Sequence, residues 1–132
     1  MATITLTIAD ETAGGKVTNQ VNITLENELT TVQDIIKARV YTEVTTYNTK
    51  MPEYYRGLIQ PGETEQTLNG YKMKERRKVD AEQQYLTALD AFQKNGFFML
   101  IDNIQAESLE QMVVINPNTS ISFIKLTPLV GG

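Results

Sequence analysis

The chain has 132 residues, of which 41% are hydrophobic and 21% charged, and its formal net charge is −4 at pH 7. This size and composition are typical of one folded domain, and the mild negative charge argues against general binding to nucleic acid or to a membrane surface. The sequence contains no cysteine and no histidine, which excludes disulfides and thiolate chemistry and removes the commonest general base and metal ligand.

The sequence also lacks the common motifs of enzymes and of exported or membrane proteins. We find no Gly-rich phosphate loop, no calcium loop and no nucleophile elbow, so the sequence favours a protein that is not an enzyme. It also lacks an apolar run of about 18 residues and a basic segment followed by an apolar one, which are the signals for membrane insertion and export. We therefore expect a cytoplasmic protein whose partner is another protein or a small molecule.

The N-terminal segment 3–9 alternates apolar residues with threonine, which predicts a half-buried strand. Segment 20–26 repeats this alternation, and the Gly14-Gly15 pair between the two permits the positive φ that a hairpin turn needs. The two segments predict an N-terminal β-hairpin. The side chains expected to face the core are Ile4, Leu6, Ile8, Val21, Ile23 and Leu25.

A helical pattern follows the hairpin. We expect Thr30 to cap this helix, with Gln33 reaching back to it. The apolar stripe predicts about four turns at roughly 3.6 residues per turn. Because β-branched residues are frequent here, the helix must be stabilised by packing on the hairpin sheet. The stripe consists of Val32, Ile35, Ile36, Val40, Val44 and Tyr47.

Residues 48–79 show no regular period and contain turn signals at Pro61-Gly62 and Asn69-Gly70. We treat this stretch as an insertion of undetermined shape. Its three tyrosines are expected to pack the insertion against the domain rather than to form a ligand cage. They are Tyr54, Tyr55 and Tyr71.

The basic run at residues 72–78 has two interpretations, a patch for a phosphate-bearing partner or a solvated face. The second is favoured because the chain as a whole is acidic and Glu75 lies within the run.

A second helix is predicted from Asp80, which forms a capping pair with Gln83, to Asn95-Gly96, where a left-handed residue ends it. The five consecutive apolar residues at 97–101 predict an interior strand covered on both faces. Further strands are expected at 112–115 and 120–126, with a turn at 116–119 between them.

This order of elements predicts an α+β domain in which a mixed sheet packs on a helix. If the first and last strands pair, the helical crossover between them makes them parallel. On the last strand, alternation directs Ile121 and Phe123 toward the helix and Ile124 and Leu126 to the opposite side. Ile124 and Leu126 are candidates for an exposed partner patch, and burial beneath the second helix is an equal alternative.

The hairpin at the start and the Gly-Gly at the end resemble the ubiquitin-like β-grasp superfamily. The C-terminal third, with "MLIDN", "NPNT", "SISFIKL" and "TPLVGG", resembles the sulfur carriers of molybdopterin and thiamin biosynthesis. The resemblance covers residues 3–47 and 97–132, whereas residues 48–96 have no counterpart in the minimal fold. Ubiquitin-like modifiers encoded beside bacterial conjugation enzymes, some of them in antiphage defence loci, vary more in size and match better. We therefore expect one β-grasp domain over residues 1–127, with an insertion at 48–96, and an extended tail at 128–132.

The resemblance implies that the reactive group is the α-carboxylate of Gly132. A partner activating enzyme would use ATP and Mg²⁺ to form an acyl-adenylate, and the chain itself would bind no cofactor. Gly131 and Gly132 have no Cβ, which suits a tail that threads a narrow channel. Pro128 keeps the preceding chain extended, and we expect Pro128, Leu129 and Val130 to be recognised by the enzyme.

Three functions remain open. The first is a ubiquitin-like modifier joined to an amine of a target protein, with a conjugating enzyme and a deconjugating protease as further partners. The second is a sulfur carrier that forms a C-terminal thiocarboxylate. The third is a binding or assembly module whose apolar tail inserts into a neighbouring copy, a form of self-association.

Overall fold

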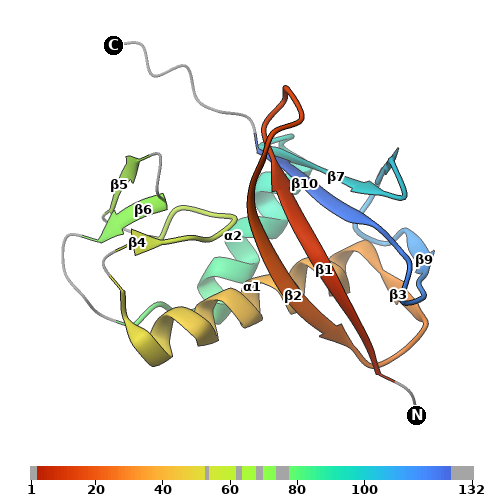
Figure 1. Cartoon of the computed structure of the whole chain (residues 1–132), viewed down its shortest axis with the longest axis horizontal. Coiled ribbons are helices and arrows are strands. Elements are labelled where there is room, and N and C mark those ends of the chain that lie inside the picture. Colours follow the sequence, from red (N-terminus) through yellow and green to blue (C-terminus); the bar gives the residue numbers. More distant parts are fainter. Residues whose placement is uncertain (1–2, 53, 62–63, 68–69, 74–77, 126–132) are drawn as a thin grey trace.

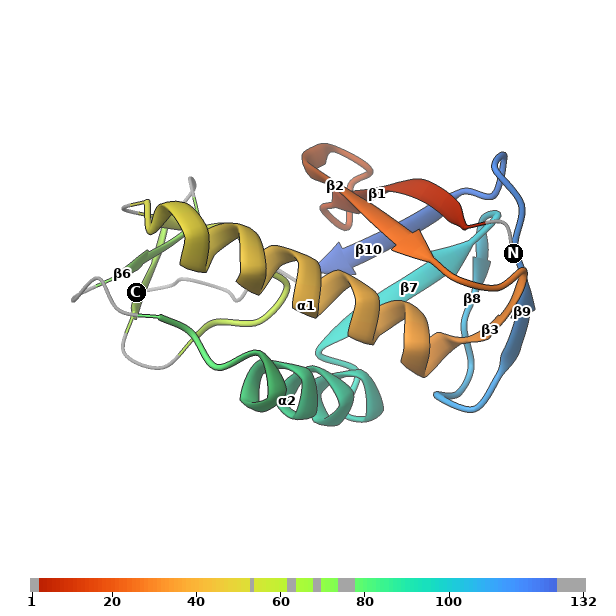
Figure 2. The same cartoon turned by 90° about the horizontal axis from the view of Figure 1, so that it is seen from below.

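The computed structural model describes residues 3–52, 54–61, 64–67, 70–73 and 78–125. Within them the chain forms two helices, a main sheet and two smaller sheets (Figures 1 and 2). The predicted α+β class and mixed sheet are confirmed. The main sheet has the strand order β2 (Val17–Leu25), β1 (Ile4–Glu11), β10 (Ile121–Lys125), β7 (Phe97–Ile101) and β8 (Ile104–Gln105).

The last strand lies in the middle of this sheet. β10 pairs in parallel with β1, placing Ile8 beside Ile121, and pairs antiparallel with β7 on its other side. β1 and β2 form the expected antiparallel hairpin, and Gly15 in its turn has φ of 90°. The first and last strands thus do pair, and they are parallel, as expected for strands joined by a helical crossover.

Helix α1 (Val32–Lys50) begins one residue later than expected. Thr31, not Thr30, is the N-cap, and its hydroxyl accepts a hydrogen bond from the Asp34 amide at 3.1 Å. Thr30 pairs with Val113 instead, because β3 (Leu29–Thr31) and β9 (Met112–Val114) form a two-stranded antiparallel sheet. Thr31 pairs with Met112 in the same sheet and is extended as well, with φ of −117° and ψ of 161°, so the helix begins only at Val32 and the predicted Thr30 cap was wrong.

The core lies between α1 and the main sheet. The inward-facing side chains predicted for the first strand are buried, as are Ile23 and Leu25 of the second, while Val21 is half-buried. All six apolar residues of the predicted α1 stripe are buried as well. Ile121 and Phe123 of β10 are at most 1% exposed. The helix therefore packs on the sheet as expected.

Helix α2 (Ala81–Gln93) lies on the same face of the main sheet as α1 (Figure 2). It is capped by Asp80 as predicted, and Asn95 supplies the left-handed residue at its end, with φ of 61°. Its Phe92 ring lies 5.9 Å from the ring of Phe97 on the inner face of β7.

The outer face of β7 is less well covered by the described residues than the inner face. Phe97 and Met99 are buried, but Phe98 and Leu100 are only half-buried. β7 lies between β10 and β8, so the predicted interior position is confirmed, whereas the expected full cover on both faces was wrong.

The insertion contains a three-stranded antiparallel sheet beside the C-terminal half of α1 (Figure 1). Tyr55 and Tyr71 are buried within it, which confirms them as packing residues, and Tyr54 is half-buried. In the basic run, Lys72 and Lys78 are exposed and residues 74–77 lie outside the described residues. The strand order is β4 (Tyr54–Tyr55), β6 (Gly70–Met73) and β5 (Thr64–Thr67).

The two faces of β10 provide a test of this arrangement. Ile121→Ala empties a fully buried site and should lower the free energy of unfolding by about 2–5 kcal/mol. Ile124→Ala is the matched control on the opposite face of the same strand, and its half-buried side chain should cost clearly less. Urea denaturation measures both, and equal losses would contradict the assignment of the two faces.

Candidate functional site

The predicted functional residues of the tail lie outside the described residues, as does Leu126 of the predicted partner patch. The tail residues are Pro128, Leu129, Val130, Gly131 and Gly132. Ile124 is described: it is half-buried on the outer face of the main sheet, where Glu11 and Phe98 are its strand neighbours. Helix α2 lies on the inner face, the opposite side from Ile124.

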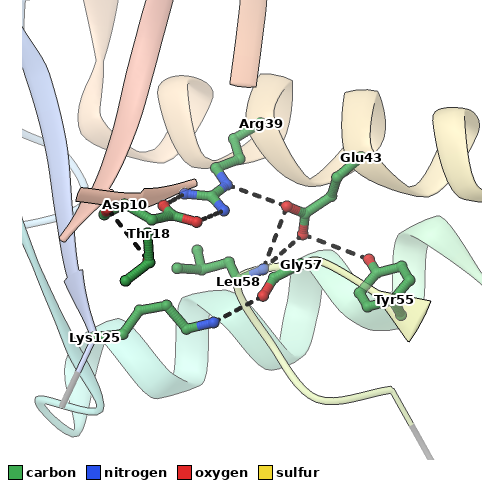
Figure 3. A network of polar contacts seen from close by, with 8 residues as sticks. All are labelled: Asp10, Thr18, Arg39, Glu43, Tyr55, Gly57, Leu58 and Lys125. Atoms are coloured by element: carbon green, nitrogen blue, oxygen red, sulfur yellow. Dashed lines mark hydrogen bonds and ion pairs between the residues drawn. The ribbon is translucent and has the colours of Figure 1, made fainter. Parts of the chain in front are cut away.

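Charged side chains gather near the end of the central strand β10. Lys125, the last described residue, ends the central strand β10. Close to it, three charged residues are enclosed in the core: Asp10 is 3% exposed, Arg39 0% and Glu43 7% (Figure 3). We take this group, Asp10, Arg39, Glu43 and Lys125, as the candidate site and call it the charged network.

The positions of these charges follow from the periods of their elements. Asp10 continues the two-residue alternation of β1 and therefore points inward. Arg39 and Glu43 are four residues apart on α1, on the stripe that carries Val40 and Val44. The same pattern that builds the core thus places three charges inside it.

Arg39 is held by both carboxylates. Its Nη1 and Nη2 donate to the two oxygens of Asp10, the second at 2.6 Å, and its Nε donates to Oε2 of Glu43 at 3.1 Å. The guanidinium carbon also lies 4.9 Å from the ring centroid of Phe123. Arg39 therefore joins α1 to β1 and to β10 with one side chain.

Glu43 connects the network to the insertion. The Leu58 amide donates to both of its oxygens, at 3.0 and 3.3 Å, and the Tyr55 hydroxyl donates to Oε1 at 3.4 Å. Gly57 lies between these two residues, and a Cβ there would overlap the Tyr55 ring and crowd Glu43. The close approach of the insertion to α1 thus depends on glycine at this position.

The charges in the network balance. The carboxylates of Asp10 and Glu43 both pair with the guanidinium of Arg39, and the ammonium of Lys125 adds a second positive charge nearby, so two acidic and two basic side chains make up the network. Burial acts to lower the pKa of Arg39, but the carboxylates of Glu43 and Asp10 outweigh it and raise that pKa. Burial raises the pKa of Glu43, opposed by Arg39 and by the Leu58 amide. Burial lowers the pKa of Lys125.

All four carboxylate oxygens of the network accept hydrogen bonds from the protein. Such saturation is the arrangement of a structural ion network rather than of a group poised to transfer a proton. The network therefore fixes the relative positions of β1, α1, β10 and the insertion.

Sequence reasoning did not single out Asp10, Arg39 or Glu43. The signal was present, because each of the three occupies a position that the strand or helix period assigns to the core. A charged residue at such a position needs a buried partner. Two core positions that carry opposite charges therefore predict an ion pair between them.

A cavity of about 570 Å³ lies next to the network, between the edge strand β2, α1 and the insertion. Its lining combines apolar surface with neutral polar side chains and includes the charged residues Glu43, Lys50 and Arg56. Among the residues that the structure describes, no group of acidic side chains is arranged to hold a metal ion. Neither helix of this part of the chain combines the length and apolar character that crossing a membrane requires.

Comparisons of the chain with protein-family models, with curated proteins and with solved structures find no match. The function is therefore inferred from the chain's own residues.

Removing the guanidinium of Arg39 from the network should strongly destabilise the folded state. Arg39→Met leaves Asp10 and Glu43 buried without their counter-charge, and we expect a loss of about 3–5 kcal/mol in the free energy of unfolding. Glu43→Gln is the milder comparison, since its amide oxygen still accepts from Leu58 and Arg39 keeps Asp10. Chemical denaturation of both variants measures the difference, and a loss no larger for Arg39→Met than for Glu43→Gln would contradict the central role of Arg39.

Stability should also fall in alkaline solution. Burial, aided by the charge of Glu43, raises the pKa of Tyr55 above its usual 10.0, and burial raises that of Tyr71. The folded state thus keeps protons that the unfolded state loses. The stabilisation that these two tyrosines contribute is complete below about pH 10 and is lost as the pH rises further. Tyrosinate absorbance should appear at higher pH in the folded chain than in urea. Coincident titrations would overturn the prediction.

Proposed function

We propose that this chain is a ubiquitin-like protein modifier with a β-grasp fold. Its Gly132 carboxylate is activated by a partner enzyme and transferred to an amine of a target protein, with antiphage defence as the proposed setting. In this role the chain is the substrate of an enzyme and not itself a catalyst.

The arrangement of the main sheet supports the β-grasp assignment. A hairpin, β2 and β1, is followed by a helix that packs across the sheet, and the last strand returns in parallel beside the first. The helix α1 buries its apolar stripe against this sheet, which is the packing that gives the fold its name. The extra sheet and α2 lie between α1 and β7 in the sequence, where an insertion leaves the strand pairing intact.

One observation carries the functional proposal. The central strand β10 ends at Lys125, and the sequence that follows it is "LTPLVGG", Leu126 to Gly132. A strand in the middle of a sheet is held on both sides, so it gives a following segment a firm point of attachment. The composition of that segment, with one proline, no charge and two final glycines, suits a handle for an enzyme channel.

The proposed chemistry has two steps. A carboxylate oxygen of Gly132 attacks the α-phosphorus of ATP, with Mg²⁺ on the phosphates, and pyrophosphate leaves. An amine of the target, directly or after passage through an enzyme thiol, then attacks the carbonyl carbon. AMP, or the thiol, is released together with a proton, and an amide bond remains.

Mass spectrometry tests the proposal. The protein is expressed with its neighbouring genes, and cellular proteins are digested with trypsin after denaturation. Because Lys125 is the last tryptic site in the chain, a modified lysine should carry residues 126–132 as a branch. The same experiment with a variant lacking Gly131 and Gly132 should give no branched peptide.

The matched control is Gly14→Ala, because a Cβ at Gly14 meets only the Thr12 hydroxyl, at 3.8 Å. This variant should be conjugated as well as the original chain. A thiocarboxylate on Gly132, with no branched peptide, would replace the modifier by a sulfur carrier. Full function without the two glycines, together with concentration-dependent self-association, would replace it by an assembly module.

A further inference from the structure

The side chain of Lys125 touches two separate parts of the insertion. Its Nζ donates a hydrogen bond to the carbonyl oxygen of Gly57 at 2.9 Å (Figure 3). The same ammonium lies 5.2 Å from the ring centroid of Tyr71, over the face of the ring. Gly57 follows β4 and Tyr71 belongs to β6, so one lysine binds both a loop and a strand of the insertion.

The partners of Lys125 are themselves fixed to α1. Gly57 stands next to Leu58, whose amide is held by Glu43, and Tyr71 pairs with Tyr55 in the insertion sheet. Tyr55 in turn contacts both Glu43 and Tyr47 of α1, the latter with ring centroids 5.3 Å apart. The contacts of Lys125 therefore connect the end of β10 to the part of the insertion that is bonded to α1.

The far end of the insertion is fastened as well. The side-chain amide of Asn48 donates to the carbonyl oxygen of Val79 at 2.9 Å, and the Val79 amide donates back to Asn48 at 2.8 Å. Gln84 of α2 also donates to the carbonyl oxygen of Ile59 at 3.0 Å. The insertion is thus attached at several points besides Lys125.

A lysine is an unusual choice for this position. Burial disfavours its ammonium, as the lowered pKa of Lys125 reflects, and an apolar side chain would fill the same space without that cost. The carbonyl oxygen of Gly57 and the ring face of Tyr71 offset the cost of burying the ammonium. Both contacts are directional, so they fix the position of the strand end, whereas an apolar contact would only cover it.

We propose that Lys125 is a positioning residue that locks the end of β10 to the insertion and so fixes the point from which residues 126–132 begin. An enzyme that contacts the chain where it leaves β10 would contact the insertion there as well, because Lys125 is bonded to it. The insertion is therefore part of the surface that the activating enzyme recognises. This last step rests on the proposed function, whereas the lock itself does not.

Amide hydrogen exchange tests the lock in the full chain. The Lys125→Met variant keeps an apolar stem but loses the ammonium. In it, the backbone amides of residue 125 and of its strand partner Phe97 should exchange about tenfold faster. Ile121, at the other end of β10, should be unaffected and serves as the internal reference. The matched control is Lys94→Met, because Lys94 is exposed and pairs only with the surface residue Asp90 in the described part of the chain.

A second pair of variants removes the ring instead of the charge. Tyr71→Leu should quicken exchange at the end of β10 as Lys125→Met does, while Tyr71→Phe retains the ring face and should not. Faster exchange throughout the chain, including Ile121, would mean that the fold and not the lock is lost. Unchanged exchange in both Lys125→Met and Tyr71→Leu would overturn the lock.

The recognition step is tested with the activating enzyme identified by the conjugation experiment. Pyrophosphate release is measured against the concentration of the modifier. For Lys125→Met the KM should rise about tenfold with kcat unchanged, since the carboxylate itself is intact, and Lys94→Met should match the original chain. If the original chain releases no pyrophosphate, the proposed function fails. If it does and Lys125→Met performs equally well despite faster exchange, the recognition role of the lock fails.

Discussion

The arrangement of this domain depends on one guanidinium placed in its core. Arg39 has no exposed surface, and its charge is tolerated only because Asp10 and Glu43 bind it from two sides. Neither carboxylate would be stable there alone. The strand and the helix that carry these residues therefore have one relative placement in which all three charges are satisfied, and the planar, bidentate geometry of arginine makes that placement specific.

From this centre the constraint extends to the rest of the molecule. Glu43 uses its remaining hydrogen-bonding capacity on the insertion, and Arg39 lies over the ring of Phe123 in the central strand. Apolar packing alone would allow the small insertion sheet to slide against α1, because hydrophobic contacts have little directionality. The hydrogen bonds to the Leu58 amide and the Tyr55 hydroxyl remove that freedom.

Sequence periodicity predicted the elements that bury one regular face. The alternation in β1 and the stripe of α1 gave the core residues correctly, and the parallel pairing followed from the order of the elements. Boundaries were less secure, because Thr30 and Thr31 are equally good caps, and only the pairing of Thr31 with Met112, which keeps Thr31 extended, decides between them. The charged network and the β7–β8 turn, where Asp102 and Asn103 both have positive φ, depend on partners distant in sequence or on local geometry that no period marks.

The reciprocal hydrogen bonds between Asn48 and Val79 bring the two ends of the insertion together, which is the geometry of a segment that can be removed without stretching the chain. Because of the charged network, however, removing the insertion would lower the stability of the domain. Without Leu58 and Tyr55, Glu43 would keep only Arg39 as its partner in the core. The insertion and the acidic residue on α1 therefore depend on each other: the insertion supplies the hydrogen bonds that make a carboxylate at position 43 tolerable in the core.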